Sequence, residues 1–515
     1  MKPHELPIKG SYLAGVLCAL IIGFSPNGLC CLYGNERPNI VFIVTDDQAS
    51  WAMGCALQDT GHSNVAAAVT PNMDRLARDG ARFTNCFCAT PVCSPARAAL
   101  ATGRYASEFG IKDFIPGPDH KLFNPKYQPA LDPDKSVTFA EILKANGYYT
   151  GLIGKWHVGD WTLPGNERFH PTHHGFDHFM GLPGGGTTPV DPELEKDGVI
   201  RKFKGLTTDI LTDEALDFLV KAKSRNKPFL LCFHTRAPHA VWLPVAPEDW
   251  APYESLDPAI PAYPDLDVKK VKRMMREYLA STSGVDRNLG RLLKKLDMLG
   301  LTDKTIVILT SDHGYNMGHN GVWHKGNGIW ATKKHPPGKW HRGTRVISDK
   351  YRPNLYDRSL KTPAIVRWPG VVRPGTVIKD TVSHLDLFPT LLTMAKADAP
   401  QGTVLRGRDL TPLLKGNTPA DWDQDLYAEY SMINYAVATM RCYRTPRYKL
   451  IRDFFNPQRD ELYDLQSDPA ETKNLIRDTD PAIKAVIADL NAKILAKMRA
   501  NGDPLLGELQ KGNAP

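Results

Sequence analysis

Charged and imidazole side chains follow four short apolar runs of the sequence, at the points where the runs end. The runs are Ile40–Val44, Tyr149–Ile153, Phe229–Phe233 and Ile306–Leu309. The side chains that follow them are Asp46, Asp47, Lys155, His157, His234, His239, Asp312 and His313. Each run is bounded by polar, Gly or Pro residues and is too short for a helix, so each predicts a buried strand. Because ligands bind beyond the carboxyl ends of the strands in an open parallel sheet, we expect these side chains to meet at one rim.

The three carboxylates of this group indicate a bound cation. Asp46, Asp47 and Asp312 would repel one another at close range unless a cation offset their charge. Oxygen ligands favour a hard ion such as calcium or magnesium. His313 would supply a neutral nitrogen to the ion or would contact a substrate beside it. Either acidic motif alone is also typical of a turn or a helix cap, and it is their shared position after two predicted strands that favours a metal site.

A candidate nucleophile lies in the pentapeptide Cys93-Ser94-Pro95-Ala96-Arg97. The proline is at home in the first turn of a helix and small residues follow it, so the sequence predicts Cys93 at a helix N-terminus. Backbone N–H groups and the helix dipole favour a thiolate there. Arg97 lies one turn later, and its side chain can reach back to Cys93. A lone Cys is more often a small buried hydrophobe, and the spacing of Cys86, Cys88 and Cys93 fits no common zinc site.

The elements that must position these residues form an α/β pattern, which predicts a mostly parallel central sheet flanked by helices on both faces. A fifth buried strand is predicted at Ala364–Trp368, and helices are predicted at Thr70–Gly80, Ser136–Asn146, Asp209–Lys221 and Arg273–Leu299. After about Gly402 the pattern changes to candidate strands at Tyr435–Met440 and Tyr448–Arg452 and an amphipathic helix near Ala482–Ala500. The chain therefore divides into an N-terminal segment (1–34), a main domain (36–400) and a smaller C-terminal antiparallel subdomain (401–515).

The N-terminal segment predicts export. Lys2 and Lys9 precede a short apolar run, Leu13–Phe24, which helix-breaking residues then end, as in a secretory signal. The run is too short to favour a spanning helix, and no other long apolar stretch follows it. We therefore expect a periplasmic or secreted protein with no stable membrane span in its mature form. Cys30 and Cys31, close to the predicted cleavage point, leave lipid attachment as an alternative.

The composition is that of a globular protein. The chain is 42% hydrophobic and 23% charged, which excludes the disordered and fibrous classes. The net charge of +8 is mild for 515 residues, and it suits an acidic substrate without requiring one. Only six of the nine cysteines lie beyond residue 34, too few to indicate a disulfide scaffold at this length.

The motifs resemble those of the formylglycine-dependent sulfatases, members of the alkaline-phosphatase-like superfamily. The pentapeptide at residues 93–97 matches the Cys-x-Pro-x-Arg signature of that family, and residues 99–105 extend the match. Further matching segments, in the order found in the family, are Asn39–Asp47, Gly154–His157, Ser311–Gly314, Glu461–Leu465 and Ser467–Pro469. The resemblance spans roughly residues 38 to 475. It implies the alkaline-phosphatase-like fold, with residues 36–400 as the catalytic domain of a sulfuric ester hydrolase.

The resemblance also implies the parts of the site. Cys93 would be oxidised to formylglycine during export by a formylglycine-generating enzyme that reads the pentapeptide. A calcium ion would be held by residue 93 together with Asp46, Asp47, Asp312 and His313. The residues that match the sulfate-binding and proton-transfer groups of the family are Lys155, His157, His239 and Lys325. The segment before Lys325 departs from the usual Gly-Glu-His-Gly pattern of the family, which leaves open whether His324 shares the role of Lys325.

The reaction that the resemblance implies explains these residue types. One hydroxyl of the hydrated aldehyde at residue 93, ionised with the help of calcium and Arg97, attacks sulfur. Calcium, Lys155 and Lys325 stabilise the charge on the sulfate oxygens. His239 protonates the leaving alcohol, and His157 then takes the proton of the second hydroxyl so that the aldehyde re-forms and sulfate leaves. A serine nucleophile would lack this route, since water would have to attack its sulfate ester.

A long basic segment between Lys325 and Ala364 predicts the class of substrate. Its basic and aromatic residues are Lys333, Lys334, His335, Lys339, His341, Arg342, Arg345, Lys350 and Arg352, with Trp330, Trp340 and Tyr351 among them. Such groups bind sulfates or carboxylates and stack on sugar rings, which favours a sulfated sugar or polysaccharide over a small aryl sulfate. A solvated loop is the other interpretation. No nucleic-acid fold pattern accompanies the segment, so we expect no nucleic-acid partner.

Two other functions stay open from the sequence. One is a phosphoester or phosphonate hydrolase of the same superfamily. The other is a non-catalytic glycan-binding protein in which Cys93 stays a thiol. In either case Gly184-Gly185-Gly186 predicts a mobile or tightly turning loop after His157.

Overall fold

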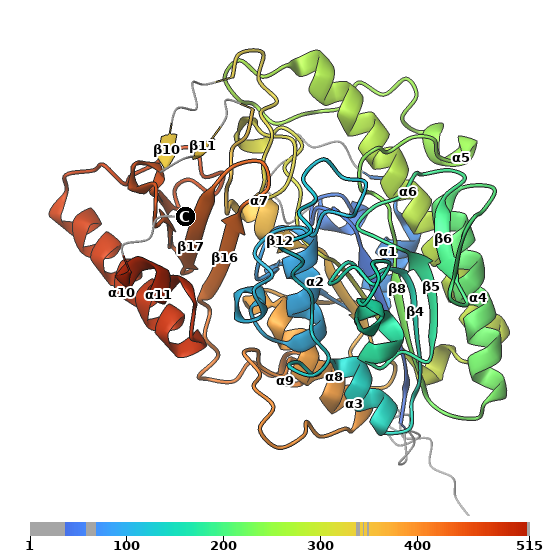
Figure 1. Cartoon of the computed structure of the whole chain (residues 1–515). Helices are drawn as coiled ribbons and strands as arrows, with labels where there is room; N and C mark the ends of the chain where they lie inside the picture. Colours follow the sequence, from blue (N-terminus) through green and yellow to red (C-terminus); the bar gives the residue numbers. More distant parts are fainter. Residues whose placement is uncertain (1–36, 58–67, 336–339, 343–344, 348–349, 512–515) are drawn as a thin grey trace, which may run out of the picture. The chain divides into compact units, whose positions relative to one another are not determined.

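The computed structural model describes residues 37–57, 68–335, 340–342, 345–347 and 350–511 (Figure 1). The predicted export signal at residues 1–34 lies outside this part of the chain. Among the helices of the described residues, none combines the length and the apolar character needed to cross a membrane.

Ten strands form the central sheet within the described part of the chain. Their spatial order is β14 (Thr376–Ile378), β2 (Ala81–Phe83), β13 (Ala364–Arg367), β9 (Thr305–Ser311), β1 (Asn39–Thr45), β8 (Phe229–His234), β4 (Tyr149–Lys155), β5 (His178–Leu182), β6 (Glu193–Lys196) and β7 (Val199–Lys202). The central strands β9, β1, β8, β4 and β5 run parallel, whereas β13 and β6 join them antiparallel on either side. The mostly parallel sheet is confirmed, and the five predicted strands match observed strands to within two residues at each end.

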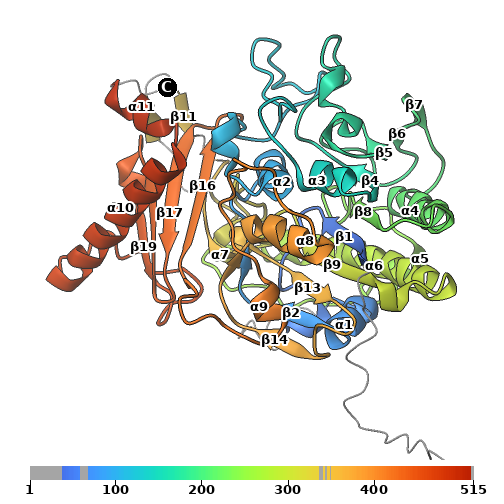
Figure 2. The same ribbon diagram turned by 90° about the horizontal axis from the view of Figure 1, so that it is seen from below.

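Helices cover both faces of this sheet (Figure 2). One face packs against α2 (Cys93–Thr102), α3 (Phe139–Ala145) and α8 (Leu387–Ala395), and the other against α1 (Pro71–Arg78), α4 (Thr207–Ser224) and α6 (Val268–Met298). Strand β1 shows why, since Ile40 and Phe42 belong to the first core and Val41 and Ile43 to the second. Successive side chains of a strand point to opposite faces, so an unbroken apolar run serves two cores. The four predicted helices are confirmed.

The C-terminal part forms a second, antiparallel sheet. Its order is β16 (Leu426–Met432), β17 (Ala438–Arg444), β18 (Tyr448–Asp453) and β19 (Glu461–Asp464). Helices α10 (Pro481–Asn501) and α11 (Leu505–Gln510) pack on one face of it, and Phe87, Val92 and Leu360 of the main domain pack on the other. The predicted antiparallel subdomain is therefore confirmed.

Three details of that subdomain differ from the prediction, one being that strand β19 was not predicted. The strand predicted at Tyr435–Met440 begins at Ala438, and Tyr435 lies in the connection between β16 and β17. Strand β16 was not predicted, because it is buried along its whole length and carries Glu429 in its middle. It therefore shows neither alternation nor an unbroken apolar run.

Short elements complete the described chain. They are α5 (Pro247–Trp250), α7 (Asp357–Leu360), α9 (Thr411–Leu414), the sheet β12 (Lys361–Thr362), β3 (Cys86–Phe87) and β15 (Val382–Ser383), and the hairpin β10 (Trp340–Arg342) and β11 (Arg345–Ile347). The boundary predicted between residues 400 and 401 falls in the connection between α8 and α9.

Candidate active site

Two neighbouring strands position the acidic residues of the site. Strands β1 and β9 end at Thr45 and Ser311, which are partners in the parallel ladder, so the residues that follow leave the sheet side by side. The Asp312 N–H donates to the Thr45 carbonyl at 3.0 Å. The Asp47 N–H in turn donates to Asp312 Oδ1 at 3.1 Å. The predicted meeting of these residues at the carboxyl edge of the sheet is thus what the structure shows.

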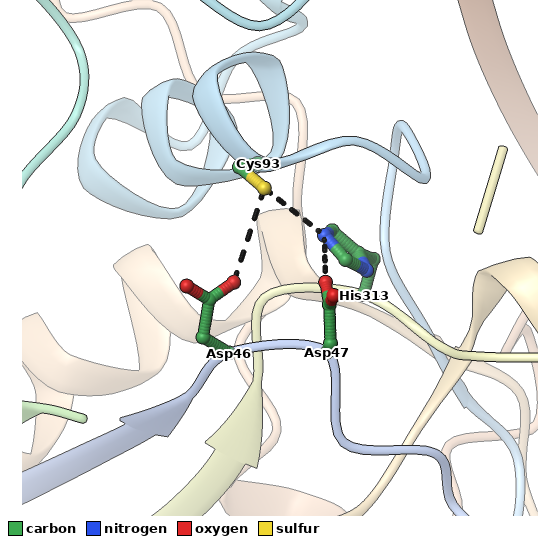
Figure 3. Close-up of side chains that lie close together, drawn as sticks. All are labelled: Asp46, Asp47, Cys93 and His313. Carbon is green, nitrogen blue, oxygen red and sulfur yellow. Dashed lines mark hydrogen bonds and ion pairs between the residues drawn. The ribbon is translucent and has the colours of Figure 1, made fainter. Parts of the chain in front are cut away.

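Four predicted metal ligands gather around one point (Figure 3). Ligand atoms of Asp46, Asp47, Cys93 and His313 all lie within 4.8 Å of one another, and all four side chains are buried. The Cys93 Sγ lies 3.8 Å from Asp46 Oδ1 and 3.5 Å from His313 Nε2. The His313 Nε2 lies 3.3 Å from Asp47 Oδ1.

The fifth predicted ligand, Asp312, lies at the edge of this group. Its Oδ1 is 3.4 Å from His313 Nε2 and accepts from the N–H groups of Asp47 and His313, at 3.1 and 3.0 Å. Its Oδ2 accepts from the Arg97 Nε at 3.1 Å. Burial raises the pKa of Asp312 to about 6. In the absence of a cation, the site therefore disfavours ionisation of this carboxyl group.

The donor set fits a hard divalent cation, provided that residue 93 carries oxygen. The buried Asp47 Oδ2 has no hydrogen-bond partner among the described residues, which is the state of an atom that a bound ion would satisfy. Carboxylate oxygens suit calcium, whereas a thiolate suits softer metals. The sulfur of Cys93 occupies the place that a formylglycine hydrate oxygen would take, and with that oxygen the set becomes carboxylates, one hydroxyl and one imidazole.

Cys93 begins helix α2, as predicted, and its helix ends at Gly103 with a φ of 66°. The thiol is buried, and the Lys325 Nζ donates to its sulfur at 2.9 Å. Burial raises the pKa of the thiol, but the positive charges of Lys155 and Lys325 lower it by more than burial raises it, so that the pKa lies well below its ordinary value. The position therefore favours a negatively charged side chain.

Three buried cations hold the acidic residues in place. The Lys155 Nζ donates to Asp46 Oδ2 at 2.7 Å, and the Lys325 Nζ donates to Asp47 Oδ1 at 2.5 Å. Arg97 is 3% exposed and its Nη2 lies 3.0 Å from Asp312 Oδ2. The Arg97 Nη1 donates to the Lys155 carbonyl at 2.9 Å. Arg97 thus joins helix α2 to the ends of strands β4 and β9.

Besides the predicted ligand His313, four histidines near the catalytic group differ in position. His157 and His239 line the same cavity as Cys93, and His239 Nε2 lies 3.8 Å from Asp47 Oδ2. His324, whose role the sequence left open, lines the cavity as well, and burial and Lys325 lower its pKa to about 4. His234 is buried behind the site, where its Nδ1 lies 3.1 Å from the Lys155 carbonyl.

These groups open into a cavity of about 1080 Å³. The loop with Gly184, Gly185 and Gly186 lines it, and a Cβ on Gly185 would come within 2.3 Å of His157 Nε2. Gly185 therefore leaves room for the His157 ring, whereas a Cβ on Gly184 or Gly186 would meet no other atom within 4 Å. Close packing against the site accounts for the middle glycine of the run.

The basic segment contributes less to the cavity than its composition predicted. Of its described side chains, Lys350 and Tyr351 line the cavity. Arg352 pairs instead with Glu461 of strand β19, and Trp330 is buried. Those two residues therefore pack against the protein, which corrects their assignment to substrate contact. Lys339 and the side chains of Trp340, His341, Arg342 and Arg345 lie outside what the structure describes.

The sequence prediction missed several cavity residues. Phe114, His120 and Lys121 come from the loop after α2, and Tyr435 comes from the C-terminal subdomain. No local motif marks these positions, because Phe114 and His120 contact Tyr435 from more than 300 residues away in the chain. Only the packing of the C-terminal sheet on the main domain brings them together.

Comparisons with known proteins agree with this geometry. The sulfatase family profile matches residues 38–397, and the profile of the C-terminal region of N-sulphoglucosamine sulphohydrolase matches residues 348–500. N-acetylglucosamine-6-O-sulfatase of Bacteroides thetaiotaomicron is 29% identical over 523 residues, covering 85% of this chain and 83% of its own. Steryl-sulfatase of Rattus norvegicus is 27% identical over 567 residues, covering 90% of each chain.

A solved structure shares the fold over almost the whole chain. It is a complex with its substrate D-glucosamine-2-N,6-O-disulfate, it is 26% identical, and it superposes with a TM-score of 0.72. The match covers 91% of this chain and 99% of the other.

Proposed function

From the premise that this chain belongs to the sulfatase family and is a sulfuric ester hydrolase, we propose that it removes sulfate from a sulfated sugar or polysaccharide. It would do so through a formylglycine made from Cys93 and a bound calcium ion. One observation carries the proposal. The four buried groups Asp46, Asp47, Cys93 and His313 surround a single point. The ammonium groups of two lysines form salt bridges with the two aspartates of this group.

The protein groups divide the work of sulfate transfer between them. When present, calcium and the formylglycine hydrate supply a hydroxyl nucleophile and a positive charge beside the sulfate oxygens. Lys155 and Lys325 bind those oxygens as their charge grows. Burial lowers the pKa of Lys325, but the negative charges of Asp47 and Cys93 raise it by more than burial lowers it, so its ammonium group stays charged. Arg97 fixes the position of Asp312 relative to the first turns of α2.

Two histidines move the protons. His239 lines the cavity with its ring near Asp47 and is assigned to protonate the leaving alcohol oxygen. His157 also lines the cavity, and its Nε2 atom lies 2.9 Å from the Ile115 carbonyl. Burial lowers the pKa of His157, which keeps the ring neutral and able to take the proton of the second hydroxyl at residue 93.

The choice of a sugar rests on relatives and on the cavity. N-acetylglucosamine-6-O-sulfatase and the complex with a glucosamine disulfate are similar to this chain over most of its length. The cavity holds about 1080 Å³, just above the roughly 300–1000 Å³ of small-molecule sites. A sulfated sugar with further units attached fits such a space better than a small aryl sulfate.

Mass spectrometry of the peptide with Cys93 tests the nucleophile. Protein from the native host is expected to carry formylglycine at residue 93, and an unmodified thiol there would contradict the proposal. Sulfate release from N-acetylglucosamine 6-sulfate, glucosamine 6-sulfate and carrageenan oligosaccharides, followed by ion chromatography, tests the substrate class. Phosphate and phosphonate monoesters are assayed beside them. A higher kcat/KM for those esters than for every sulfate ester would favour a phosphoester hydrolase.

Calcium binding is tested without an activity assay. Adding calcium to chelator-treated protein is expected to raise its melting temperature, because the ion binds only the folded site. The Asp47→Asn variant, which keeps the shape of the side chain, is expected to show little or no rise. An equal rise in both proteins would place the bound calcium elsewhere.

Export completes the proposal. The predicted signal at residues 1–34 and the modification of Cys93 by a formylglycine-generating enzyme both imply passage out of the cytoplasm. N-terminal sequencing of protein recovered from the native host is expected to start beyond the apolar run at residues 13–24. A protein that keeps this run and stays in the cytoplasm would contradict export.

A further inference from the structure

An aromatic cluster outside the catalytic group lines the same cavity. Its half-buried rings are Phe114, His120, Tyr351 and Tyr435. The rings of Tyr351 and Tyr435 stack with centroids 5.0 Å apart and planes 10° from parallel. Phe114 lies 5.7 Å from both Tyr435 and His120, and the Tyr435 hydroxyl lies 3.3 Å from His120 Nε2.

Two exposed lysines accompany the rings. The Lys121 Nζ lies 5.9 Å from the centroid of Tyr435, and the Lys350 Nζ lies 5.7 Å from that of Tyr351. Both distances fall within the range of a cation–π contact. Neither ammonium group has an ion pair to a carboxylate within the described part of the chain, so both charges are available to a ligand in the cavity.

Buried contacts hold the cluster in one arrangement. Asp113, next to Phe114, is 3% exposed and accepts from the N–H groups of Ile433 and Asn434 at 3.0 and 3.1 Å. The Asn434 side-chain amide donates to the Phe114 carbonyl at 2.8 Å. These bonds fasten the connection between β16 and β17, which carries Tyr435, to the loop after α2. The aromatic surface is therefore preformed.

The chemistry of this surface selects its ligand. Flat rings with polar edges pack against the C–H faces of a pyranose, and nearby ammonium groups bind its carboxylate or sulfate. An apolar group, such as a steroid, would gain from the rings but would leave the two lysines without an anionic partner. A charged sugar satisfies both kinds of group.

We propose that Tyr351, Tyr435, Lys121 and Lys350 form a subsite for an anionic sugar unit next to the one that loses sulfate. The inference rests on the proposed function and extends it, since it makes an oligosaccharide the preferred substrate. The nucleophile and the subsite line one cavity of about 1080 Å³, which exceeds the space that a single small ligand fills.

The test compares two kinds of substrate in the full-length modified enzyme. 4-Nitrophenyl sulfate reports on the catalytic group alone, and a heparin or carrageenan hexasaccharide reports on the subsite, as a substrate or as a competitive inhibitor. Tyr435→Ala is expected to raise the KM or Ki of the hexasaccharide about tenfold while kcat/KM for 4-nitrophenyl sulfate changes less than twofold. Lys121→Ala and Lys350→Ala are expected to raise it about twofold to fivefold, and less at high salt.

Matched variants separate the subsite from general effects. Lys126→Ala and Lys334→Ala remove the same charge from exposed positions on the same two segments that do not line the cavity, and neither is expected to change the hexasaccharide constants. Tyr435→Phe keeps the ring and is expected to retain most of the affinity. Unchanged hexasaccharide constants in Tyr435→Ala would overturn the subsite, and an equal loss with 4-nitrophenyl sulfate would show a structural role instead.

Two further outcomes are informative. A loss of activity toward a steroid sulfate, with hexasaccharide constants unchanged, would assign the rings to an apolar ligand and overturn the inference. If the unaltered enzyme hydrolysed no sulfate ester, the proposed function would fail by itself. Calorimetric titration of the hexasaccharide into the Cys93→Ser protein, with and without the second substitution Tyr435→Ala, would then still measure binding at the subsite. Equal affinity in the two variants would overturn the inference.

Discussion

Lys325 and Lys449 are two buried lysines that each bridge two acidic groups, and they serve different ends. Lys325 is 3% exposed and contacts Asp47 and Cys93 at 2.5 and 2.9 Å. Lys449 is fully buried and contacts Asp357 and Glu471 at 2.9 and 2.7 Å. Both ammonium groups have raised pKa values, because burial lowers the pKa in each case but the neighbouring acidic groups raise it further.

The surroundings of the two lysines separate them. Around Lys449 the charges are matched, since Asp357 also pairs with Arg444 at 3.0 Å and the Asp357 N–H donates to Glu471 at 2.6 Å. Around Lys325 the Asp47 Oδ2 lacks a hydrogen-bond partner among the described residues, and the group lines a large cavity. Buried charge therefore does not identify a functional site. Buried charge that stays incompletely paired beside a cavity does.

Replacing the nucleophile should have the largest effect on turnover. Cys93→Ala is expected to lower kcat/KM for sulfate esters at least about 10⁴-fold, because no other side chain can take its place. The unfolding midpoint in urea should change little. Cys88→Ala, which removes a buried thiol that does not line the cavity, should keep turnover within about threefold. Near-normal turnover in Cys93→Ala would refute the assignment.

Lys449→Met tests the paired side of the comparison. Removing this cation leaves Glu471 buried without its partner, so the free energy of unfolding is expected to fall by about 3–5 kcal/mol. The kcat/KM of the protein that remains folded should not change, because Lys449 does not line the cavity. Urea unfolding and active-site titration measure the two quantities. A loss of kcat/KM with stability unchanged would reverse the comparison.

Lys325→Met tests the other side of the comparison, the incompletely paired group beside the cavity. The variant should lose about 10²–10³-fold in kcat/KM, since it removes one group that stabilises charge on the sulfate oxygens. Lys334→Met removes the same charge from an exposed position nearby in the chain and should change kcat/KM less than twofold. Steady-state kinetics with 4-nitrophenyl sulfate gives both values. Equal small effects in the two variants would remove Lys325 from the reaction.

A buried histidine away from the cavity should affect stability alone. His174 packs against Trp156, and burial lowers its pKa from 6.5 to about 4. Its folded pKa lies below the unfolded one, so it contributes stability that is present above pH 6.5 and is lost as the pH falls through 4. Between pH 7 and pH 4 the protein is expected to lose about 2–3 kcal/mol more than His174→Phe does.

The measurement is urea unfolding at several pH values. His335→Phe replaces an exposed histidine in another segment of the chain and should show the pH dependence of the unaltered protein. A constant difference between the unaltered protein and His174→Phe across this range would contradict a depressed pKa. Turnover of His174→Phe at pH 7 should be normal, since His174 does not line the cavity.

Much of the catalytic group was predictable from the sequence because most of its members follow a strand or lie in the first turns of a helix, whereas Lys325 was identified by the resemblance to the family alone. A buried parallel strand announces itself as a short apolar run, and the residues after it must lie at the carboxyl edge of the sheet. Asp46, Lys155 and His313 were located in this way. Cys93 was located by the proline that starts its helix. The order of the strands in the sheet was not predictable, because sequence order does not fix which strands are neighbours.

The aromatic residues that line the cavity away from the catalytic group could not be predicted from the sequence. Tyr435 was expected in a strand and lies in a connection, and Phe114 and His120 carry no motif at all. These residues meet because a sheet formed by residues 426–464 packs on the loop after α2, and such packing depends on complementary surfaces that no local pattern encodes. Arg352 is the opposite case. The composition of its segment suggested a substrate contact, but its guanidinium forms an ion pair with Glu461.

The sequence by itself determined five strands of the central sheet, the helix that carries Cys93 and the set of acidic and basic groups, since backbone periodicity and capping act over a few residues. The tertiary structure alone decided which of those charges are paired, which remain open to a ligand, and which aromatic rings border the nucleophile. Pairing and exposure depend on distances between segments far apart in the chain, and only the packed fold sets those distances.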